Sequence, residues 1–566
     1  MKKVISICLI AGTMLSLPLF ARLNTSRTEM IKDIDIIQRT FEERYAPSEW
    51  KKEYTGWELV NETTVAKNTI INNPSINLKD FWNVITHLFE STKDYHVTVD
   101  FFSTEKATLP FNVRHINGRY YFSYISKALA EENFPFKPGD ELIAMDGMLI
   151  NDVIKDLKKY HQVSNFEGTD MRFAALHLTH RVGALGHDIP YGPITLTGTT
   201  KFGQRLSFQT LWKYEAEQML CSFGSAQNCS ENNSKADLPI YRKQFIFPQH
   251  AHYCPKTQAE NENTERIGAK CSPLPNLGAV LWKSDEDSPF DAHFFELAHH
   301  IGACIRIPTY SPREYSVEEG IEEFSQLIQM AEATADFLVI DQLSNPGGDM
   351  LYLFQLLSML TDKPLQIYPH RIKLTQDEVF EGIKYIPWIE DLDEEKLADY
   401  IKTMNYESQA EVFTKHGIKN YFRDILEEWN QKNYLTKPIY LMGIEYIPPH
   451  PSIHFTKPIV VLTDELDFSC ADFFPEILQR NGRALIFGSR TAGAGGAVES
   501  FSFPNTRGIA AISYTSTIAI RPDGSYLENQ GVIPDVPYQI TAYDIQNQYA
   551  GYVGSLHQTI QAMLSF

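Results

Sequence analysis

Cysteine is scarce in this chain of 566 residues, which contains seven. Long hydrophobic runs are also scarce, since beyond residue 21 no stretch is apolar enough to cross a bilayer. No run of Lys and Arg occurs, and the net charge is −20. Because this charge repels nucleic acid and anionic membranes, the expected partners are proteins or peptides and small molecules, with no nucleic acid.

Several catalytic motifs are missing as well. Neither glycine-rich stretch is followed by the Lys-Ser/Thr of a phosphate-binding loop or has dinucleotide-site spacing. No G-x-S-x-G motif occurs, which disfavours an α/β-hydrolase. His293, Glu296 and His300 could lie near one helix face but match no zinc-protease motif. We therefore expect no cofactor and no metal site.

Residues 1–21 have the features of an export signal. Lys2 and Lys3 precede an apolar run that ends at Phe20, and Ala21 is a small residue before a polar chain. The run is short and interrupted by hydroxyl residues, so a cleaved signal peptide is expected rather than a membrane anchor. Its removal takes the net charge to about −22. The mature protein is expected to be secreted, and action in the periplasm, outside the cell or within a host cell is left open.

Two regions of different character follow the signal. Residues 22–105 are rich in helix formers and aromatic residues with apolar positions at helical spacing, so a helical region is expected. Residues 106–215 contain short apolar runs between Gly, Asp and Pro, which predict a β-rich module. Within them KPGDELIAMDG resembles the turn-strand-turn pattern of a PDZ domain. Such a module offers a sheet edge and a groove for an extended peptide.

Residues 216–275 are polar and contain few periodic apolar positions. A segment of this kind between domains is typically a linker or a functional flap, and it is where proteases cut. It contains four cysteines, Cys221, Cys229, Cys254 and Cys271. In an exported protein these could form two disulfides in three connectivities, whereas in a reducing compartment the thiols would stay free.

From residue 276 to residue 566 apolar runs alternate with helical patterns, which predicts an α/β fold with a mainly parallel, twisted sheet. A charged helical excursion is expected within this domain. The expected strands are 301–307, 337–341, 459–462 and 484–487, the helices are 317–331, 349–360 and 469–479, and the excursion covers 388–432.

Ser469 lies where the strand at 459–462 gives way, through a polar turn, to the helix at 469–479. A hydroxyl at a helix N-terminus lies near free backbone N–H groups and the positive end of the dipole, which favour a developing oxyanion. The position therefore suits a nucleophile. Ser469 and Asp472 could instead form a capping box, and Pro475 could delay the start of the regular helix.

His96 marks the point where the helical pattern changes to strand-like alternation over 96–102. A histidine at such a junction is commonly a hydrogen-bonded structural residue, yet it can also serve as a base near neutral pH. If it is a catalytic base, activity should rise with pH as it loses its proton, near a pKa of about 6.5 unless its surroundings shift that value.

Four motifs occur together in one order: DQLSNPGG after a strand, the Ser469 strand-helix junction, SRTAGAGG and a closing NQGVIPDV. In this combination the chain resembles the tail-specific, or C-terminal-processing, serine proteases, including tricorn-like enzymes. Within that clan, YAPSEWKKEYTGWELV, DYHVTVDFF and DFSCADFFP are similar to the family of chlamydial protease-like activity factors. The resemblance covers most of the mature chain and is weakest over 216–275. It implies a crotonase-like α/β catalytic domain beside the PDZ-like module and the N-terminal helical region.

The resemblance also implies a serine endopeptidase with a Ser-His-Glu triad. At the matching positions Ser469 is the nucleophile, His96 is the general base and Glu528 orients the imidazole. The enzyme would be a zymogen that cuts itself within 216–275 and acts as a homodimer.

An oxyanion hole is implied at two places in the sequence. One donor would be the backbone N–H of Cys470, and the other would be that of Gly347 or Gly348. The sequence does not distinguish the two glycines.

Two alternatives to the triad remain. Many tail-specific proteases use a Ser-Lys dyad, but SRTAGAGG carries Arg490, which cannot act as a base near neutral pH. A Ser-Lys peptidase would need Lys457 or another lysine. The second alternative is a non-catalytic scaffold that binds peptides in the PDZ-like groove. The presence of Ser469, His96 and Glu528 together argues against it, because a dead site needs none of them.

Overall fold

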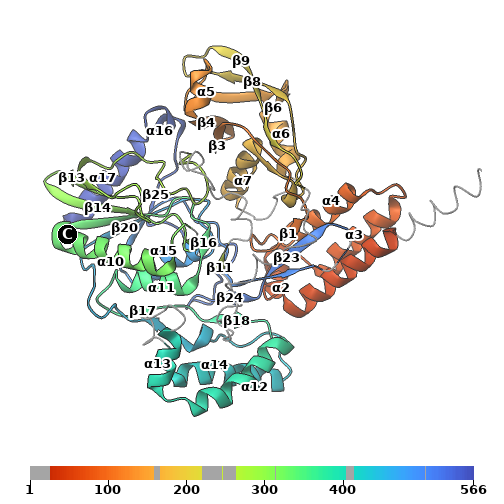
Figure 1. The fold of residues 1–566 in the computed structure, drawn as a ribbon, viewed down its shortest axis with the longest axis vertical. Helices are drawn as coiled ribbons and strands as arrows, with labels where there is room; N and C mark the ends of the chain where they lie inside the picture. The colour runs from red at the N-terminus through yellow and green to blue at the C-terminus, as the bar shows by residue number, and fades with distance from the viewer. Residues whose placement is uncertain are drawn as a thin grey trace, which may run out of the picture.

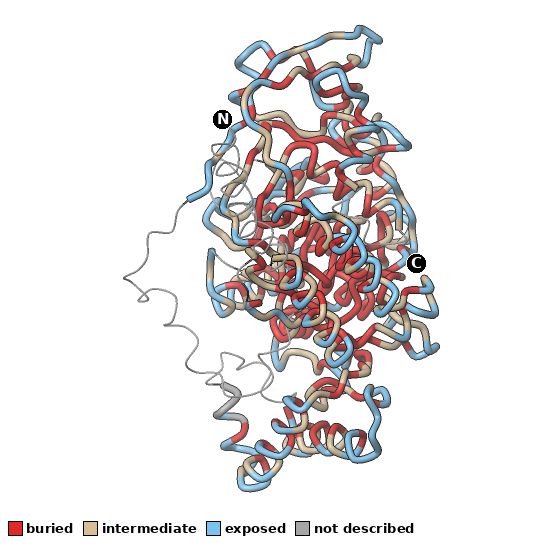
Figure 2. The backbone as a smooth tube through the Cα atoms, turned by 90° about the vertical axis from the view of Figure 1, so that its right-hand side faces the viewer, coloured by how far each residue is buried: buried red, intermediate tan, exposed pale blue. Residues whose placement is uncertain are grey.

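The computed structural model describes residues 26–158, 166–218, 245–246, 263–312, 314–402, 413–503, 505 and 507–565. The expected signal peptide lies outside these ranges. Within them, no helix combines the length and the hydropathy needed to cross a membrane. Figure 1 shows the N-terminal helices on one side of the molecule, the β-rich module at the top and a helical excursion at the bottom. Buried residues form a continuous mass in the middle of the molecule (Figure 2).

The N-terminal region is helical, as the apolar spacing predicts, and it packs against strands from the C-terminal part of the chain. Its core contains Ile34 and Phe81 together with Ile512. Strand β1 pairs antiparallel with β23, with Val99 opposite Ile512. The elements are a helix over 26–44, α2 (Ser48–Thr55), α3 (Leu59–Asn72), α4 (Leu78–Glu90), β1 (Thr98–Phe101), β22 (Val498–Ser502) and β23 (Ile509–Thr515).

The β-rich module is built on a sheet with the strand order β3-β4-β5-β8-β9, and β6 also pairs with β5. KPGDELIAMDG supplies the turn into β5 and the turn at Asp146 and Gly147 after it. Helix α7, which was not expected, is buried on most sides and contacts β3. The elements are β2 (Lys106–Thr108), β3 (Phe111–Ile116), β4 (Arg119–Ile125), α5 (Lys127–Glu131), β5 (Glu141–Met145), β6 (Met148–Leu149), α6 (Ile150–Leu157), α7 (Glu167–Thr179), β7 (His180–Val182), β8 (Pro193–Thr199), β9 (Arg205–Leu211) and β10 (Lys213–Glu215).

The C-terminal α/β domain is organised around a sheet with the strand order β12-β13-β14-β15-β20-β21-β25. The pairs from β14 to β25 are parallel and the β12-β13-β14 edge is antiparallel, so the prediction of a mainly parallel sheet is confirmed. The strands are β12 (Ala279–Lys283), β13 (Ala292–Leu297), β14 (His300–Arg306), β15 (Phe337–Asp341), β20 (Ile459–Thr463), β21 (Leu485–Gly488) and β25 (Val536–Pro537).

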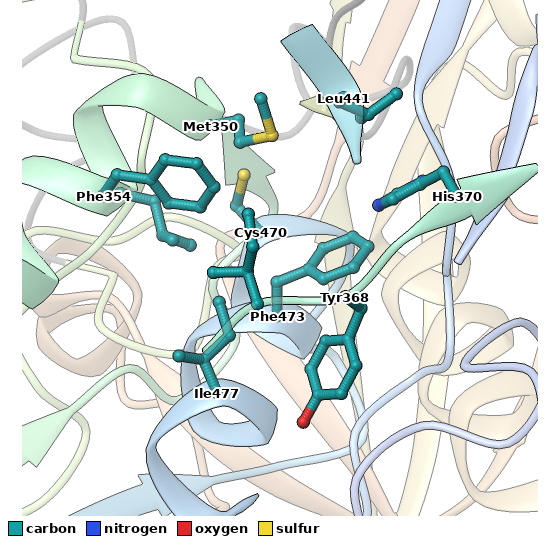
Figure 3. Close-up of a pocket in the computed structure, with 10 residues that line it drawn as sticks. Met350, Phe354, Tyr368, His370, Leu441, Cys470, Phe473 and Ile477 are labelled. Carbon is teal, nitrogen blue, oxygen red and sulfur yellow. The ribbon is translucent and has the colours of Figure 1, made fainter. Parts of the chain in front are cut away.

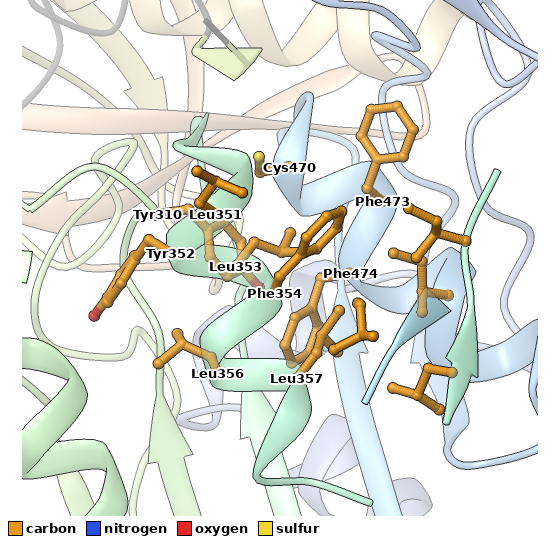
Figure 4. Close-up of a cluster of buried hydrophobic side chains, with 14 of the residues drawn as sticks. Tyr310, Leu351, Tyr352, Leu353, Phe354, Leu356, Leu357, Cys470, Phe473 and Phe474 are labelled. Carbon is orange, nitrogen blue, oxygen red and sulfur yellow. The ribbon is translucent and has the colours of Figure 1, made fainter. Parts of the chain in front are cut away.

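Helices cover both faces of this sheet. Ile340 and Val461 pack with α11 and α15 in one core, which Figure 4 shows in close-up. Val339 and Val460 point to the other face and pack with α17. Burial on both faces explains why β15 and β20 read as continuous apolar runs. The helices are α10 (Val317–Thr334), α11 (Met350–Ser358), α15 (Cys470–Arg480), α16 (Ala542–Gln546) and α17 (Ala550–Leu564).

The helical excursion begins earlier than expected. Thr375 caps α12 by accepting a hydrogen bond from the Glu378 N–H, which places the start at Gln376 rather than near residue 388. The helices of the excursion are α12 (Gln376–Asp391), α13 (Glu394–Lys402) and α14 (Lys415–Asn430). The remaining short strands of the domain are β16 (Gly347–Gly348), β17 (Leu365–Gln366), β18 (His370–Ile372), β19 (Tyr446–Ile447) and β24 (Thr517–Ala519).

Two further expectations need correction. His293, Glu296 and His300 do not share a helix face, because they lie on the hairpin formed by β13 and β14. Pro475 does not delay the helix, because α15 runs from Cys470 through the proline.

The segment expected at 216–275 is described in part. Strand β11 (Phe245–Ile246) pairs antiparallel with β16. At the downstream end Ile267 and Ala269 are fully buried, and the Gly268 N–H donates to the Ser344 carbonyl at 2.9 Å. Residues 263–275 are therefore part of the packed domain. Of the four cysteines considered for disulfides, Cys271 is a free thiol, and Cys221, Cys229 and Cys254 lie outside the described residues.

Candidate active site

Ser469 is held in an unusual backbone conformation at the start of α15. Its φ is 59° and its ψ is −115°, a sparsely populated region for a residue with a side chain, and the residue is fully buried. The Ser469 N–H donates to Asp472 Oδ2 at 2.8 Å. The Asp472 carboxylate also accepts from the N–H groups of Gly493 and Ala494. The capping-box carboxylate therefore fixes the serine backbone against the glycine-rich loop.

Gln342 explains how α15 tolerates Pro475. Proline has no N–H, so the carbonyl four residues earlier, at Ala471, loses its helical donor. The Gln342 Nε2 group donates to that carbonyl at 2.7 Å. Gln342 also accepts from the Tyr310 hydroxyl at 2.9 Å and is fully buried. One side chain thus joins the DQLSNPGG loop to the nucleophile helix.

Replacing Gln342 with leucine should destabilise the protein. The change leaves the Ala471 carbonyl and the Tyr310 hydroxyl without their partners, at a cost of about 1–3 kcal/mol each. Thermal unfolding, followed with wild type and variant side by side, measures the effect. Replacing the exposed Gln329 of α10 with leucine is the control and should leave the midpoint nearly unchanged. An unchanged midpoint for Gln342→Leu would contradict this account.

His96 lies in the turn before β1 and is fully buried. Neither of its ring nitrogens has a hydrogen-bond partner among the residues that the structure describes. Its backbone N–H donates to Asp94 Oδ1 at 2.9 Å. Burial lowers the pKa of His96 to about 4, with the Asp94 charge opposing the shift and Lys51 adding to it. The surroundings therefore shift the pKa of His96 below its unperturbed value of about 6.5, and sequence alone does not reveal the burial that causes the shift.

Glu528 lies in the turn after β24 and is also buried. Its Oε2 accepts from the Gly495 N–H at 2.9 Å, and its Oε1 accepts from the Lys51 ammonium at 2.5 Å. Burial raises the pKa of Glu528 to about 7, the Asp94 charge adds to the shift, and Lys51 opposes it. Sequence reasoning missed Lys51, although it lies within the string YAPSEWKKEYTGWELV.

Two of the candidate residues are linked by hydrogen bonds to the loop at 491–495, Ser469 through Asp472 and Glu528 directly. Asp472, at the nucleophile helix, and Glu528 accept hydrogen bonds from consecutive residues of this loop. Tyr95, beside His96, packs against Phe468, beside Ser469, with ring centroids 5.2 Å apart. Among the described residues, the imidazole makes no hydrogen bond to Ser469 or Glu528.

The two glycines of β16 lie next to Ser469 and Cys470. A methyl group at Gly347 would lie 2.8 Å from Ser469 Cβ and 3.0 Å from the Cys470 nitrogen, and φ is +89° there, so glycine is required. The Gly347 N–H already donates to Asn345 Oδ1 at 2.8 Å. Cys470 is the first residue of α15, so its N–H has no intrahelical partner. Because the Gly347 N–H is engaged by Asn345, the N–H groups of Cys470 and Gly348 remain as the candidate donors to an oxyanion.

An apolar pocket opens beside Cys470 (Figure 3). Side chains from α11, α15 and the strand at β18 surround it, and few polar atoms face it. Its lining includes Met350, Phe354, His370, Leu441, Phe473 and Ile477. A pocket of this composition next to the nucleophile suits an apolar side chain of a bound peptide.

The lysine alternative fits the structure poorly. The Lys457 ammonium donates to the carbonyls of Glu332 and Ala335 at the end of α10, before β20 begins. Ser469 follows the opposite end of this strand, whose five residues span about 16 Å. Arg490 stacks on Phe166, with its guanidinium 4.4 Å from the ring centroid.

The sequence profile of peptidase family S41 matches residues 302–538, and that of the PDZ domain matches residues 105–219. A protein of Chlamydia trachomatis is 34% identical over 92% of this chain and 90% of its own length. A protein of Chlamydia muridarum is 32% identical over 94% of this chain and 93% of its own length. The crystal structure of mature CPAF aligns with a TM-score of 0.79 and 31% identity, covering 95% of this chain and 98% of that chain. CPAF complexed with lactacystin aligns with a TM-score of 0.78.

A PDZ domain joined to an S41 peptidase fold, with an N-terminal helical region, defines this chain as a serine protease. It belongs to the family of CPAF, the chlamydial protease-like activity factor. The predicted fold class and the predicted protease activity are therefore confirmed, and the scaffold alternative loses its support.

Proposed function

We propose that the protein is an endopeptidase that hydrolyses protein substrates through a Ser469-His96-Glu528 triad and an acyl-enzyme. The observation that carries the proposal is the strained Ser469 at a helix N-terminus, against the glycines of β16. The burial of all three side chains adds support, as do the contacts of Asp472 and Glu528 with the loop at 491–495.

The chemistry follows from these roles. Neutral His96 takes the proton of Ser469 Oγ as the oxygen attacks the scissile carbonyl, and then gives it to the leaving amine. Ionised Glu528 orients the imidazole and stabilises its protonated form. The N–H groups of Cys470 and Gly348 stabilise the developing oxyanion. Water then hydrolyses the acyl-enzyme.

A fluorophosphonate probe tests this proposal directly. Such probes react with an activated serine, so the cut wild-type protein should be labelled and peptide mapping should place the label on Ser469. Replacing His96 with alanine should abolish the labelling, because the hydroxyl is then no longer activated. Labelling at another serine would overturn the proposal.

The pH dependence of kcat/KM should separate the two titrating residues. Since the pKa of His96 is lowered to about 4, this residue is already neutral above pH 5. Since the pKa of Glu528 is raised to about 7, its ionisation should make activity rise as pH increases through neutrality. Replacing Glu528 with glutamine should lower activity and remove this rise. A rise that persists in the variant would belong to His96 instead.

We further propose that the intact chain is a zymogen. The pairing of β11 with β16 supports this, because an extended strand beside Gly347 and Gly348 occupies the position that a substrate backbone would take. Burial of Ser469 in the intact chain agrees with a covered site. Because residues 263–275 are packed into the domain, we expect the chain to be cut before residue 263. Export after loss of residues 1–21 and action as a homodimer are proposed on the sequence and the family relationship.

A further inference from the structure

Lys51 is the one lysine that is fully buried among the residues that the structure describes. Its ammonium lies 2.5 Å from Glu528 Oε1, 2.6 Å from Asn529 Oδ1 and 2.8 Å from the Lys93 carbonyl. An ammonium has three donors, and all three are used here. A buried cation with a complete set of partners is held in one place.

These contacts join two distant parts of the chain. Lys93 belongs to the turn that carries His96, and its carbonyl also accepts from Asn529 Nδ2 at 2.6 Å. Glu528 and Asn529 lie more than 430 residues further on, in the catalytic domain. Lys51 itself comes from α2 in the helical region. The ammonium therefore connects the turn that carries the proposed base to the turn that carries the proposed acid.

The contact between Lys51 and Glu528 also affects the protonation of Glu528, because a second carboxylate is buried near it. The carboxylate of Asp94 is buried nearby and is held by the hydroxyls of Tyr45 and Thr515. Besides Lys51 on α2, the titratable groups that act on Glu528 or feel its charge are Asp94 and Tyr45. The charges of Asp94 and Lys51 also act on the His96 imidazole. Two carboxylates buried together favour a proton on one of them unless a cation compensates. Within the described residues, Lys51 is the cation that contacts Glu528.

We propose that Lys51 is a positioning residue for catalysis, which keeps Glu528 ionised and fixes its carboxylate relative to His96. This inference rests on the proposed triad. It assigns Lys51 no contact with substrate and no proton transfer. Its effect on the reaction passes through Glu528.

The test compares Lys51→Met, Glu528→Gln and the double variant with wild type. Methionine keeps the length of the side chain and removes the charge. At pH 7, Lys51→Met should lower kcat/KM about 100-fold, and the rise of activity should move to higher pH by one unit or more, because the uncompensated carboxylate holds its proton more tightly. The deficit should therefore shrink at pH 9. The fraction of cut chain is read by gel in the same samples.

Lys52→Met is the matched control. Lys52 is adjacent in sequence, but its side chain is exposed and pairs with Glu58 on the surface. This variant should keep wild-type kcat/KM within about twofold, as expected for a surface ion pair.

The double variant decides whether Lys51 acts through Glu528. If it does, Lys51→Met with Glu528→Gln should be no slower than Glu528→Gln alone, within about threefold. This comparison also stands if Lys51→Met fails to fold, because in the double variant residue 528 no longer carries a charge that needs Lys51. A double variant that is much slower than Glu528→Gln alone overturns the inference. A Lys51→Met enzyme with lower activity, a lower melting temperature and an unshifted pH profile also overturns it. Wild-type activity in Glu528→Gln would instead overturn the proposed triad.

Discussion

Replacing Ser469 with alanine is expected to lower peptide hydrolysis by about four orders of magnitude or more while leaving the fold intact. The variant loses one buried hydroxyl and keeps the backbone contact of Ser469 with Asp472. Replacing His96 with alanine should cost about as much, because members of a triad act as a unit. Hydrolysis of a fluorogenic peptide by variants of confirmed melting temperature measures both.

The control for this prediction is another serine close to the sheet. Ser489 follows β21, is buried, and donates to the Tyr538 carbonyl at 3.3 Å. Ser489→Ala should reduce kcat/KM only slightly, because its hydroxyl has no assigned role in the reaction. If Ser469→Ala or His96→Ala keeps activity within about tenfold of wild type, the assignment of that residue is wrong.

Local patterns were sufficient to predict the central strands. Both β15 and β20 are short apolar runs because their two faces are buried, and this property is visible in a few consecutive residues. The position of Ser469 at the start of a helix follows from the same local signal. The helix α7 was missed because residues 169–179 are buried almost all round, which leaves no amphipathic period to detect.

Contacts between distant residues limited the prediction of the site. Gln342 meets Ala471 across 129 residues, and Lys51 meets Glu528 across 477. Pro475 does predict that the carbonyl four residues earlier needs a hydrogen-bond donor from outside the helix, since proline has no N–H. Nothing in the sequence identifies Gln342 as that donor. The low pKa of His96 likewise depends on burial by segments far along the chain.

Wild-type protein is expected to cut itself and to gain activity as it does so, whereas Ser469→Ala remains a single chain. A tethered segment can block a cleft through weak contacts, because its effective concentration there is on the order of millimolar. Cleavage removes this advantage, so the backbone pairing at β16 can be taken by substrate. Parallel incubations followed by gel and peptide hydrolysis should show a lag in the wild type that ends as the cut chain accumulates.

The two fragments must stay together for the cut enzyme to work, since His96 lies before the cut and Ser469 after it. The structure provides the means: β1 pairs with β23, and Ile34 and Phe81 share a core with Ile512. Size exclusion should therefore show both fragments eluting together at native size. Full activity without a lag in a wild-type chain that stays intact would contradict self-cleavage as the switch. Equal cutting of wild type and Ser469→Ala would mean that another protease does the cutting. The fragments should remain associated in that case too, because the buried core does not depend on which protease cuts.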